Sequence, residues 1–304
     1  MKTILVTGGS GFIGRNLCKR LTSADKQILA EKIIVHSRNP KKAAKVLPDS
    51  VQIISDLNQL SQPVDILVNL AGEPIADRRW SAKRKATISQ SRIQTTQALY
   101  DYFKQAEKSP SIVISGSAIG YYGGGMANNQ PVTEEGAVQP NFSSQLCAGW
   151  ENAAQQFEQL GSRVCYLRTG IVLGEQGALS KLLPPFKLGL GGPIATGQQW
   201  MPWIHIDDMV AIIIYAIQNN ISGPINCTAP KPVTNKEFAK TLGKVLKRPA
   251  IAPMPATIVK LLFGQMGDEL MVQGQPVVPQ KLQQQGFKFY YSDLYDALNQ
   301  LLRT

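Results

Sequence analysis

Three glycines near the start of the chain have the spacing of a phosphate-binding turn. Gly8, Gly11 and Gly14 follow the apolar run 4–7 and open a segment whose apolar residues recur at helical spacing. Such a turn brings backbone close to a pyrophosphate, and the helix behind it offers free N–H groups and the positive end of its dipole. The pattern predicts a dinucleotide site, with an ordinary glycine turn as the alternative. The residues predicted to bind the cofactor here are Gly8, Ser10, Gly11, Phe12 and Ile13.

The residues after the second apolar segment predict the choice of cofactor. That segment ends in His36-Ser37-Arg38-Asn39, without the acidic residue that usually bonds the ribose 2′-hydroxyl of NAD. The hydroxyl of Ser37 and the guanidinium of Arg38 would suit a 2′-phosphate. We therefore expect NADP to be preferred over NAD. The alternative is a solvated turn before Pro40.

Two more segments that follow apolar runs are predicted to contact the cofactor. Asp56 is placed to hydrogen-bond the adenine amino group, with Leu57 beside the ring. The small residues of Leu70-Ala71-Gly72 would let the cofactor lie across the strand ends. Taken alone, either segment reads as an ordinary loop.

Short apolar segments alternate with helical patterns, and this order must position the residues above. The apolar segments are rich in β-branched residues, as are parallel strands buried on both faces. The alternation predicts an α/β fold with a doubly wound parallel sheet and a smaller C-terminal portion that faces the substrate. We expect a dinucleotide-binding domain over residues 1–170, with elements from about 200–230 returning to it, and the substrate-facing portion over 171–304. The predicted strands are 3–7, 32–36, 51–54, 66–70, 111–115 and 163–167, and the predicted helices are 11–21, 40–47, 81–106, 144–160 and 209–217.

The composition restricts the partners of the chain. Its 304 residues include 32 Lys and Arg against 21 Asp and Glu, a formal net charge of +11. This balance suits an anionic small molecule such as a dinucleotide. Because the positive charges are scattered along the sequence, nucleic acid is the least favoured partner. Mean hydropathy is −0.10, and no apolar run approaches the ~18–20 residues that span a bilayer.

Compartment and metal content can also be predicted. A strand pattern begins almost at the N-terminus, without a signal peptide, so we expect a cytoplasmic protein that does not bind membranes. The four cysteines form no Cys-x-x-Cys pair and the two histidines lie far apart. We therefore expect neither a metal site nor a disulfide framework, and buried, reduced thiols.

Several motifs together resemble the extended short-chain dehydrogenase/reductase superfamily, which includes nucleotide-sugar epimerases. They are Thr7-Gly8-x-x-Gly11-x-x-Gly14, Asn69-Leu70-Ala71-Gly72 and Ser115-Gly116-Ser117-Ala118. Others are similar to one atypical, epimerase-like branch with a short C-terminal domain of unknown function, among them Ser91-Arg92-Ile93, Gly120-Tyr121-Tyr122-Gly123 and Pro279-Gln280-Lys281-Leu282. The resemblance covers nearly the whole chain. It implies a Rossmann fold and an NADP-type cofactor contacted by Arg92 and Ser115. A surface helix charge is the alternative for Arg92.

The usual catalytic pair of that superfamily is absent from the expected helix. In a Tyr-x-x-x-Lys motif the lysine lowers the tyrosine pKa, so that the phenolate takes a proton near neutral pH. Counting back from Glu151 puts Ser143 at the tyrosine position and Cys147 at the lysine position. Tyr100 and Lys104 do form such a motif, but on the preceding predicted helix. We expect that stretch to pack or face solvent, away from the nicotinamide.

The remaining catalytic candidates are Ser117, Tyr121 and Tyr122. Ser117 would hold a substrate oxygen, and either tyrosine would act as the acid from a glycine-flanked loop at the sheet edge. Without a neighbouring cation a tyrosine pKa stays near ~10. An equally favoured interpretation is that the two tyrosines form aromatic walls of a nicotinamide pocket.

Two functions remain open at this point. One is an NADP-dependent oxidoreductase or epimerase-like enzyme that acts on a small hydroxyl or carbonyl compound. The other is an NADP(H)-binding sensor or scaffold without turnover, because the Tyr-x-x-x-Lys pair is missing from its helix.

Overall fold

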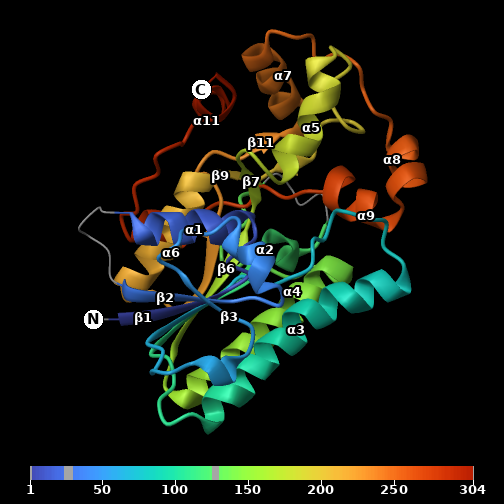
Figure 1. Ribbon diagram of the computed structural model, residues 1–304. Coiled ribbons are helices and arrows are strands. Elements are labelled where there is room, and N and C mark those ends of the chain that lie inside the picture. The colour runs from blue at the N-terminus through green and yellow to red at the C-terminus, as the bar shows by residue number, and fades with distance from the viewer. Residues whose placement is uncertain (1, 24–29, 125–129, 304) are drawn as a thin grey trace.

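A parallel sheet of seven strands forms the centre of the computed structural model, which describes residues 2–23, 30–124 and 130–303. The strand order is β10-β6-β5-β4-β1-β2-β3, and all neighbouring strands run parallel. This arrangement confirms the predicted doubly wound α/β fold (Figure 1). The strands are β1 (Lys2–Thr7), β2 (Ala30–His36), β3 (Gln52–Ile54), β4 (Ile66–Asn69), β5 (Ile112–Ala118), β6 (Arg163–Thr169) and β10 (Gly223–Cys227).

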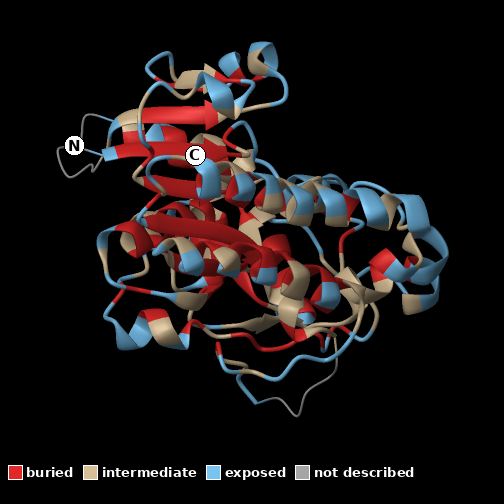
Figure 2. Cartoon of the chain, turned by 90° about the horizontal axis from the view of Figure 1, so that it is seen from below, coloured by how far each residue is buried: buried red, intermediate tan, exposed pale blue. Residues whose placement is uncertain are grey.

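Helices cover both faces of this sheet. Alternate side chains of a strand point to opposite faces, so Ile4 and Val6 of β1 join one core whereas Leu5 joins the other. Both cores consist of buried apolar side chains, and Figure 2 shows the strands as the most buried part of the chain. The first core is covered by α1 (Phe12–Thr22), α2 (Pro40–Ala44) and α6 (Ile206–Gln218), and the second by α3 (Ala82–Gln105) and α4 (Phe142–Gln155).

The remaining elements build a smaller portion with its own core. Buried aromatic and aliphatic side chains such as Phe186, Trp203 and Phe238 join its helices and short strands. Its elements are β7 (Ile171–Leu173), α5 (Ala178–Lys187), β8 (Trp200–Met201), β9 (Trp203–His205), β11 (Val233–Thr234), α7 (Asn235–Leu246), α8 (Ala256–Phe263), α9 (Gln265–Gly267), the π-helical turn η4 (Asp268–Val272) and α11 (Leu294–Arg303). The short helix α10 (Gln280–Gln284) instead packs beside β10, and its Leu282 joins the first core of the sheet. Among the described residues, no helix combines the length and apolarity that crossing a membrane requires.

The chain leaves the large sheet after β6 and later returns to it. From β9 it runs into α6, which packs beside α1, and then into β10, which pairs with β6 at the sheet edge. The sheet that carries the predicted dinucleotide site is therefore completed by residues from beyond position 200.

Local boundaries differ from the predicted ones for identifiable reasons. The helix predicted over 144–160 begins earlier, where the side chain of Asn141 caps it, and ends as the 3₁₀ turn η3 (Gln156–Leu160) before Gly161, whose φ is +79°. Strand β5 extends to Ala118, so Ser117 lies within the strand. Position 116 of this strand is a glycine because a Cβ there would lie 2.5 Å from the indole of Trp150.

Candidate cofactor and active site

The glycine turn after β1 packs so closely that side chains are excluded from it. Gly8 has φ +70°, and a Cβ there would lie 2.5 Å from the carbonyl oxygen of Leu70 at the end of β4. A Cβ on Gly14 would lie 2.3 Å from the oxygen of Gly8. The amide of Gly11 donates to that oxygen at 3.0 Å and closes the turn. The sequence therefore needs glycine here to hold α1 against the end of the sheet.

The N-terminus of α1 fits an anionic group. Gly11 is its N-cap and supplies no side-chain hydrogen bond to the N–H groups of the first turn. Uncapped N–H groups at a helix start bind phosphate oxygens readily, so the turn has the donors that a pyrophosphate requires. Ser10 and Gly11 are exposed, whereas Phe12 and Ile13 are half-buried. A Cβ on Gly174 would lie 2.5 Å from the ring of Phe12, so this ring also contacts the smaller portion.

The predicted 2′-phosphate residues lie beside this turn. Strands β2 and β4 flank β1, so the segments that follow them flank the glycine turn on its two sides. After β2, the Oγ of Ser37 accepts from the amide of Asn39 at 3.3 Å. The side chain of Arg38 is 85% exposed, and its Nη2 donates to Oε1 of Glu73, which follows β4, at 3.1 Å.

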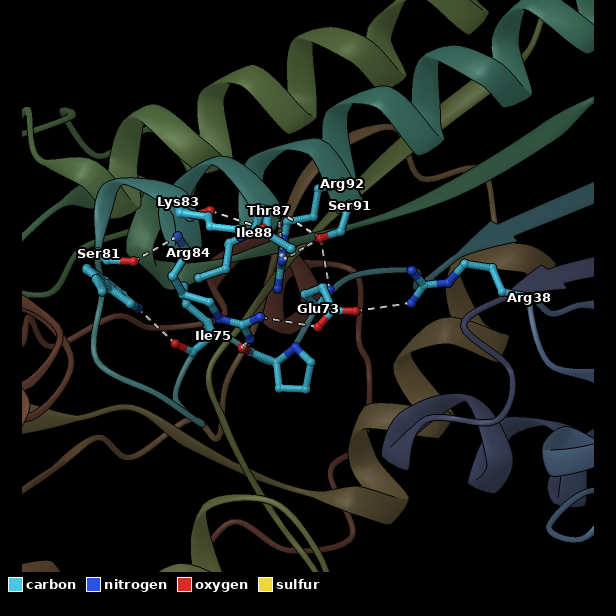
Figure 3. Close-up of polar contacts among 12 residues, drawn as sticks. Arg38, Glu73, Ile75, Ser81, Lys83, Arg84, Thr87, Ile88, Ser91 and Arg92 are labelled. Atoms are coloured by element: carbon cyan, nitrogen blue, oxygen red, sulfur yellow. Dashed lines mark hydrogen bonds and ion pairs between the residues drawn. The ribbon is translucent and has the colours of Figure 1, made fainter.

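Glu73 is a site residue that the sequence reasoning did not identify. Figure 3 shows its carboxylate between Arg38 on one side and Arg84 of α3 on the other. Nη1 of Arg84 lies 3.4 Å from Oε2, and the backbone amide of Glu73 donates to Oγ of Ser91 at 2.9 Å. Arg38, and then Arg84, lower the pKa of Glu73 below its usual value. The available signal was an acid directly after Gly72, in the predicted cofactor segment.

The two loop segments predicted to contact the cofactor follow β3 and β4 as expected. Asp56 caps the 3₁₀ turn η1 (Leu57–Gln59), where its Oδ1 accepts from the amide of Asn58 at 2.9 Å. Leu57 and Leu70 pack partly against the two opposite cores of the sheet. The amide of Ala71 donates to Oδ1 of Asn69 at 3.4 Å. Their contacts with a cofactor remain predictions.

Arg92 lies directly behind Gly72. A Cβ on Gly72 would lie 2.9 Å from the guanidinium carbon of Arg92. The same carbon lies over the Trp150 ring, 5.2 Å from the ring centroid. Nη1 donates to the carbonyl of Ile88 at 3.2 Å, and burial lowers the pKa of Arg92. Within the described ranges no carboxylate forms an ion pair with it. A half-buried guanidinium without an acidic partner suits a phosphate or another anion, and this placement disfavours the surface-charge alternative.

The two candidate serines of β5 are held by protein groups. Ser115 is fully buried, and its hydroxyl donates to the carbonyl of Gly116 at 3.2 Å. Ser117 is also buried and donates to Oε1 of Glu151 at 2.6 Å. Glu151 in turn accepts two bonds of 2.9 Å from Arg168, at the end of β6. The hydroxyl proton of Ser117 is therefore committed to Glu151, and its oxygen lone pairs are what it offers to a ligand.

The consecutive tyrosines of the turn η2 (Ile119–Tyr122) have different environments. Tyr122 is fully buried, its hydroxyl donates to Asn226 at 2.7 Å and accepts from Arg168 at 3.0 Å, and burial raises its pKa to about 12. Its burial and its two hydrogen bonds favour a structural role for Tyr122 over that of an acid. Tyr121 is half-buried, and the guanidinium carbon of Arg168 lies 3.4 Å from its ring centroid. A cation therefore packs against the ring face of Tyr121.

Other groups occupy the positions of the missing pair. The amide and the Oγ of Ser143 donate to Oε2 of Glu269, at 3.0 and 2.7 Å, so the smaller portion covers this end of α4. Cys147 is buried, and burial raises the pKa of its thiol to about 12, which keeps it neutral. Tyr100 bonds Gln159 of η3, on the side of α3 that packs against the sheet, and Lys104 lies over its ring. Neither Cys147 nor Lys104 can replace the superfamily lysine.

Known proteins are similar to this chain along nearly its whole length. The profile of the NAD dependent epimerase/dehydratase family matches residues 4–227, and that of a domain of unknown function, DUF1731, matches residues 254–301. Epimerase family protein YfhF of Bacillus subtilis is 38% identical over 304 residues, which cover 98% of this chain and 97% of the relative. Epimerase family protein SA0724 of Staphylococcus aureus is 37% identical over 306 residues, which cover all of both. The crystal structure of human epimerase family protein SDR39U1 (isoform 2) with NADPH is similar at a TM-score of 0.87, with 32% identity over 99% of each chain.

Proposed function

Because the chain belongs to the NAD dependent epimerase/dehydratase family, we propose that it binds NADP(H) in preference to NAD(H) and acts on a small hydroxyl or carbonyl compound as an oxidoreductase or epimerase-like enzyme. The preference for NADP(H) is inferred from the residues that follow β2. Arg38 projects there, 85% exposed, and no acid follows the strand where a ribose 2′-hydroxyl would be bound. The NADPH in the human relative supports the same choice.

The residues of the site divide the task between them. The glycine turn and the start of α1 would hold the pyrophosphate, with Arg92 available to a second anionic oxygen. When bound, the nicotinamide supplies or accepts a hydride. Tyr121 is the proton donor or acceptor in this proposal, because it is the more exposed phenol of the turn and the guanidinium of Arg168 packs over its ring and holds it in place. Arg168 is fixed by Glu151, so the cation stays beside the ring.

The cofactor choice is tested by replacing one side chain. A hydrogen bond to a charged group contributes about 1.5–3 kcal/mol, so Arg38→Ala is expected to remove a roughly 10- to 100-fold preference for NADPH and to leave NADH affinity nearly unchanged. Calorimetry at one ionic strength gives the four dissociation constants. Lys41→Ala, which removes an exposed charge from the neighbouring helix α2, is the control and should preserve the preference. Equal wild-type affinities for NADH and NADPH would refute the assignment.

A sensor without turnover is the second candidate. It is favoured by Ser143 and Cys147, which stand where a catalytic tyrosine and lysine would be. Sustained oxidation of NADPH with any member of a panel of aldehydes and ketones would exclude it, and Tyr121→Phe should then lower the rate. Tight NADPH binding with no oxidation across the panel would favour the sensor over the enzyme.

A further inference from the structure

We propose that Glu73 is a specificity-determining residue: it competes with the 2′-phosphate of NADP(H) for Arg38 and so limits the preference for NADPH over NADH. This inference rests on the proposed function, because it assumes that Arg38 receives that phosphate. What is new is that the Glu73 carboxylate already binds the Arg38 guanidinium before the cofactor arrives.

The position of the ion pair in the sheet is the first support. Arg38 follows β2 and Glu73 follows β4, and β1 with its glycine turn lies between these two strands. The 3.1 Å contact therefore joins the segments on the two sides of the turn. In Figure 3 the Arg38 side chain reaches Glu73 from the side opposite Arg84. A dinucleotide seated on the turn has to share this space with the pair.

The two partners are held very differently. Glu73 is 27% exposed and is fixed by Arg84, itself 17% exposed, and by the bond from its amide to Ser91. Arg84 also donates to the carbonyl of Pro74 at 2.5 Å, which fixes the segment around Glu73 at a second point. Arg38 is 85% exposed, and Glu73 is its one ion-pair partner among the described residues. When a second anion arrives, Arg38 is therefore the group that moves, and the Glu73 carboxylate stays.

The chemistry of the two anions makes the exchange selective. Guanidinium binds phosphate and carboxylate through the same N–H groups. A 2′-phosphate must draw Arg38 away from an ionised carboxylate that is still held by Arg84. NADH carries no 2′-phosphate, so it gains nothing from this exchange. The presence of Glu73 should therefore weaken NADPH binding selectively.

The test is a double-mutant cycle on the full chain. Glu73→Gln removes the charge and keeps the size, and it is expected to tighten NADPH binding by up to roughly fivefold, the upper end of the range for an exposed ion pair, with NADH affinity unchanged. In the Arg38→Ala background the same substitution should have no effect on NADPH. Asp77→Asn is the matched control, because it neutralises an acid on the same segment that pairs with Lys181 instead. It should leave both affinities unchanged.

The outcomes separate this inference from the proposed function. If NADPH is preferred and Arg38→Ala abolishes the preference, but Glu73→Gln leaves NADPH affinity unchanged or weaker, only the inference fails. Equal tightening in both backgrounds would overturn competition for Arg38 and indicate direct repulsion of the phosphate. If the wild type binds neither dinucleotide, or binds both equally, the proposed function and this inference fail together.

Discussion

Arg168 at the end of β6 and Glu151 on α4 form a buried, two-bonded ion pair, with both N···O distances at 2.9 Å. The same guanidinium donates to the hydroxyl of Tyr122 and to the carbonyl of Glu134. Glu134 accepts from the amides of Asn226 on β10 and Lys281 on α10. Arg168 and Glu134 thus join the end of β6 to α4, β10 and α10.

Replacing that cation should destabilise the protein strongly. Arg168→Met leaves the buried carboxylate of Glu151 unpaired, which typically costs about 3–5 kcal/mol. Urea unfolding of both proteins measures the difference. Lys108→Met, which breaks a pair with Asp65 in which the lysine is 55% exposed, is the control and should cost under about 1 kcal/mol. Similar small losses in both variants would contradict the structural role of Arg168.

Two glycines of the turn should respond differently to substitution. Gly11 has φ −75°, and its Cβ would lie 3.1 Å from the oxygen of Gly8, so Gly11→Val should fold but lose dinucleotide binding because the side chain occupies the pyrophosphate space. Gly14→Ala places its Cβ 2.3 Å from the same oxygen and should unfold at a clearly lower temperature. Calorimetry with NADPH and thermal unfolding check both. Unchanged NADPH affinity in Gly11→Val would remove the turn from the site.

The Tyr-x-x-x-Lys motif on α3 should be dispensable for binding and activity. The hydroxyl of the buried Tyr100 bonds Gln159, and the exposed Lys104 lies 5.9 Å from the Tyr100 ring centroid. Tyr100→Phe and Lys104→Ala should leave cofactor affinity unchanged, with a small loss of stability for the tyrosine. A fall in activity of more than about tenfold, or roughly 1.4 kcal/mol, without unfolding would mean that the catalytic helix is α3.

Asp208 should make stability depend on pH. It is fully buried at the start of α6, and burial raises its pKa to about 6, while the amides of Tyr290 and Tyr291 oppose the rise. The folded protein therefore keeps this proton up to about pH 6, whereas the unfolded chain releases it near pH 4. The contribution to stability is present below pH 4 and is lost as the pH rises through 6, by at most about 3 kcal/mol.

The variant Asp208→Asn isolates this contribution. It cannot titrate, so the difference in unfolding free energy between wild type and variant should shift toward the variant from pH 4.5 to pH 7.5. Urea unfolding at both values measures it, and the buried His205 nearby cancels in the difference. A difference that does not change with pH would show that Asp208 is ionised throughout this range.

The parts of the fold predicted from sequence are those with local signals. The glycine spacing and the short apolar strands follow from backbone sterics and burial over a few residues, as at Gly8 and β1. The environment of Tyr122 could not be predicted, because the side of the turn that each tyrosine faces depends on Arg168 and Asn226, which lie 46 and 104 residues away. Glu73 was missed for a similar reason, since its partner Arg38 lies 35 residues earlier.

The return of the chain to its own sheet has a consequence for how the protein can be divided. A fragment that ended near residue 170 would lack β10 and α6, and would bare the edge of β6 and the apolar side chains that α6 covers, among them Leu17 and Ile114. An open strand edge beside exposed core favours aggregation. Residues 1–170 are therefore not a domain that can be produced alone. The sheet and the smaller portion should unfold in one transition.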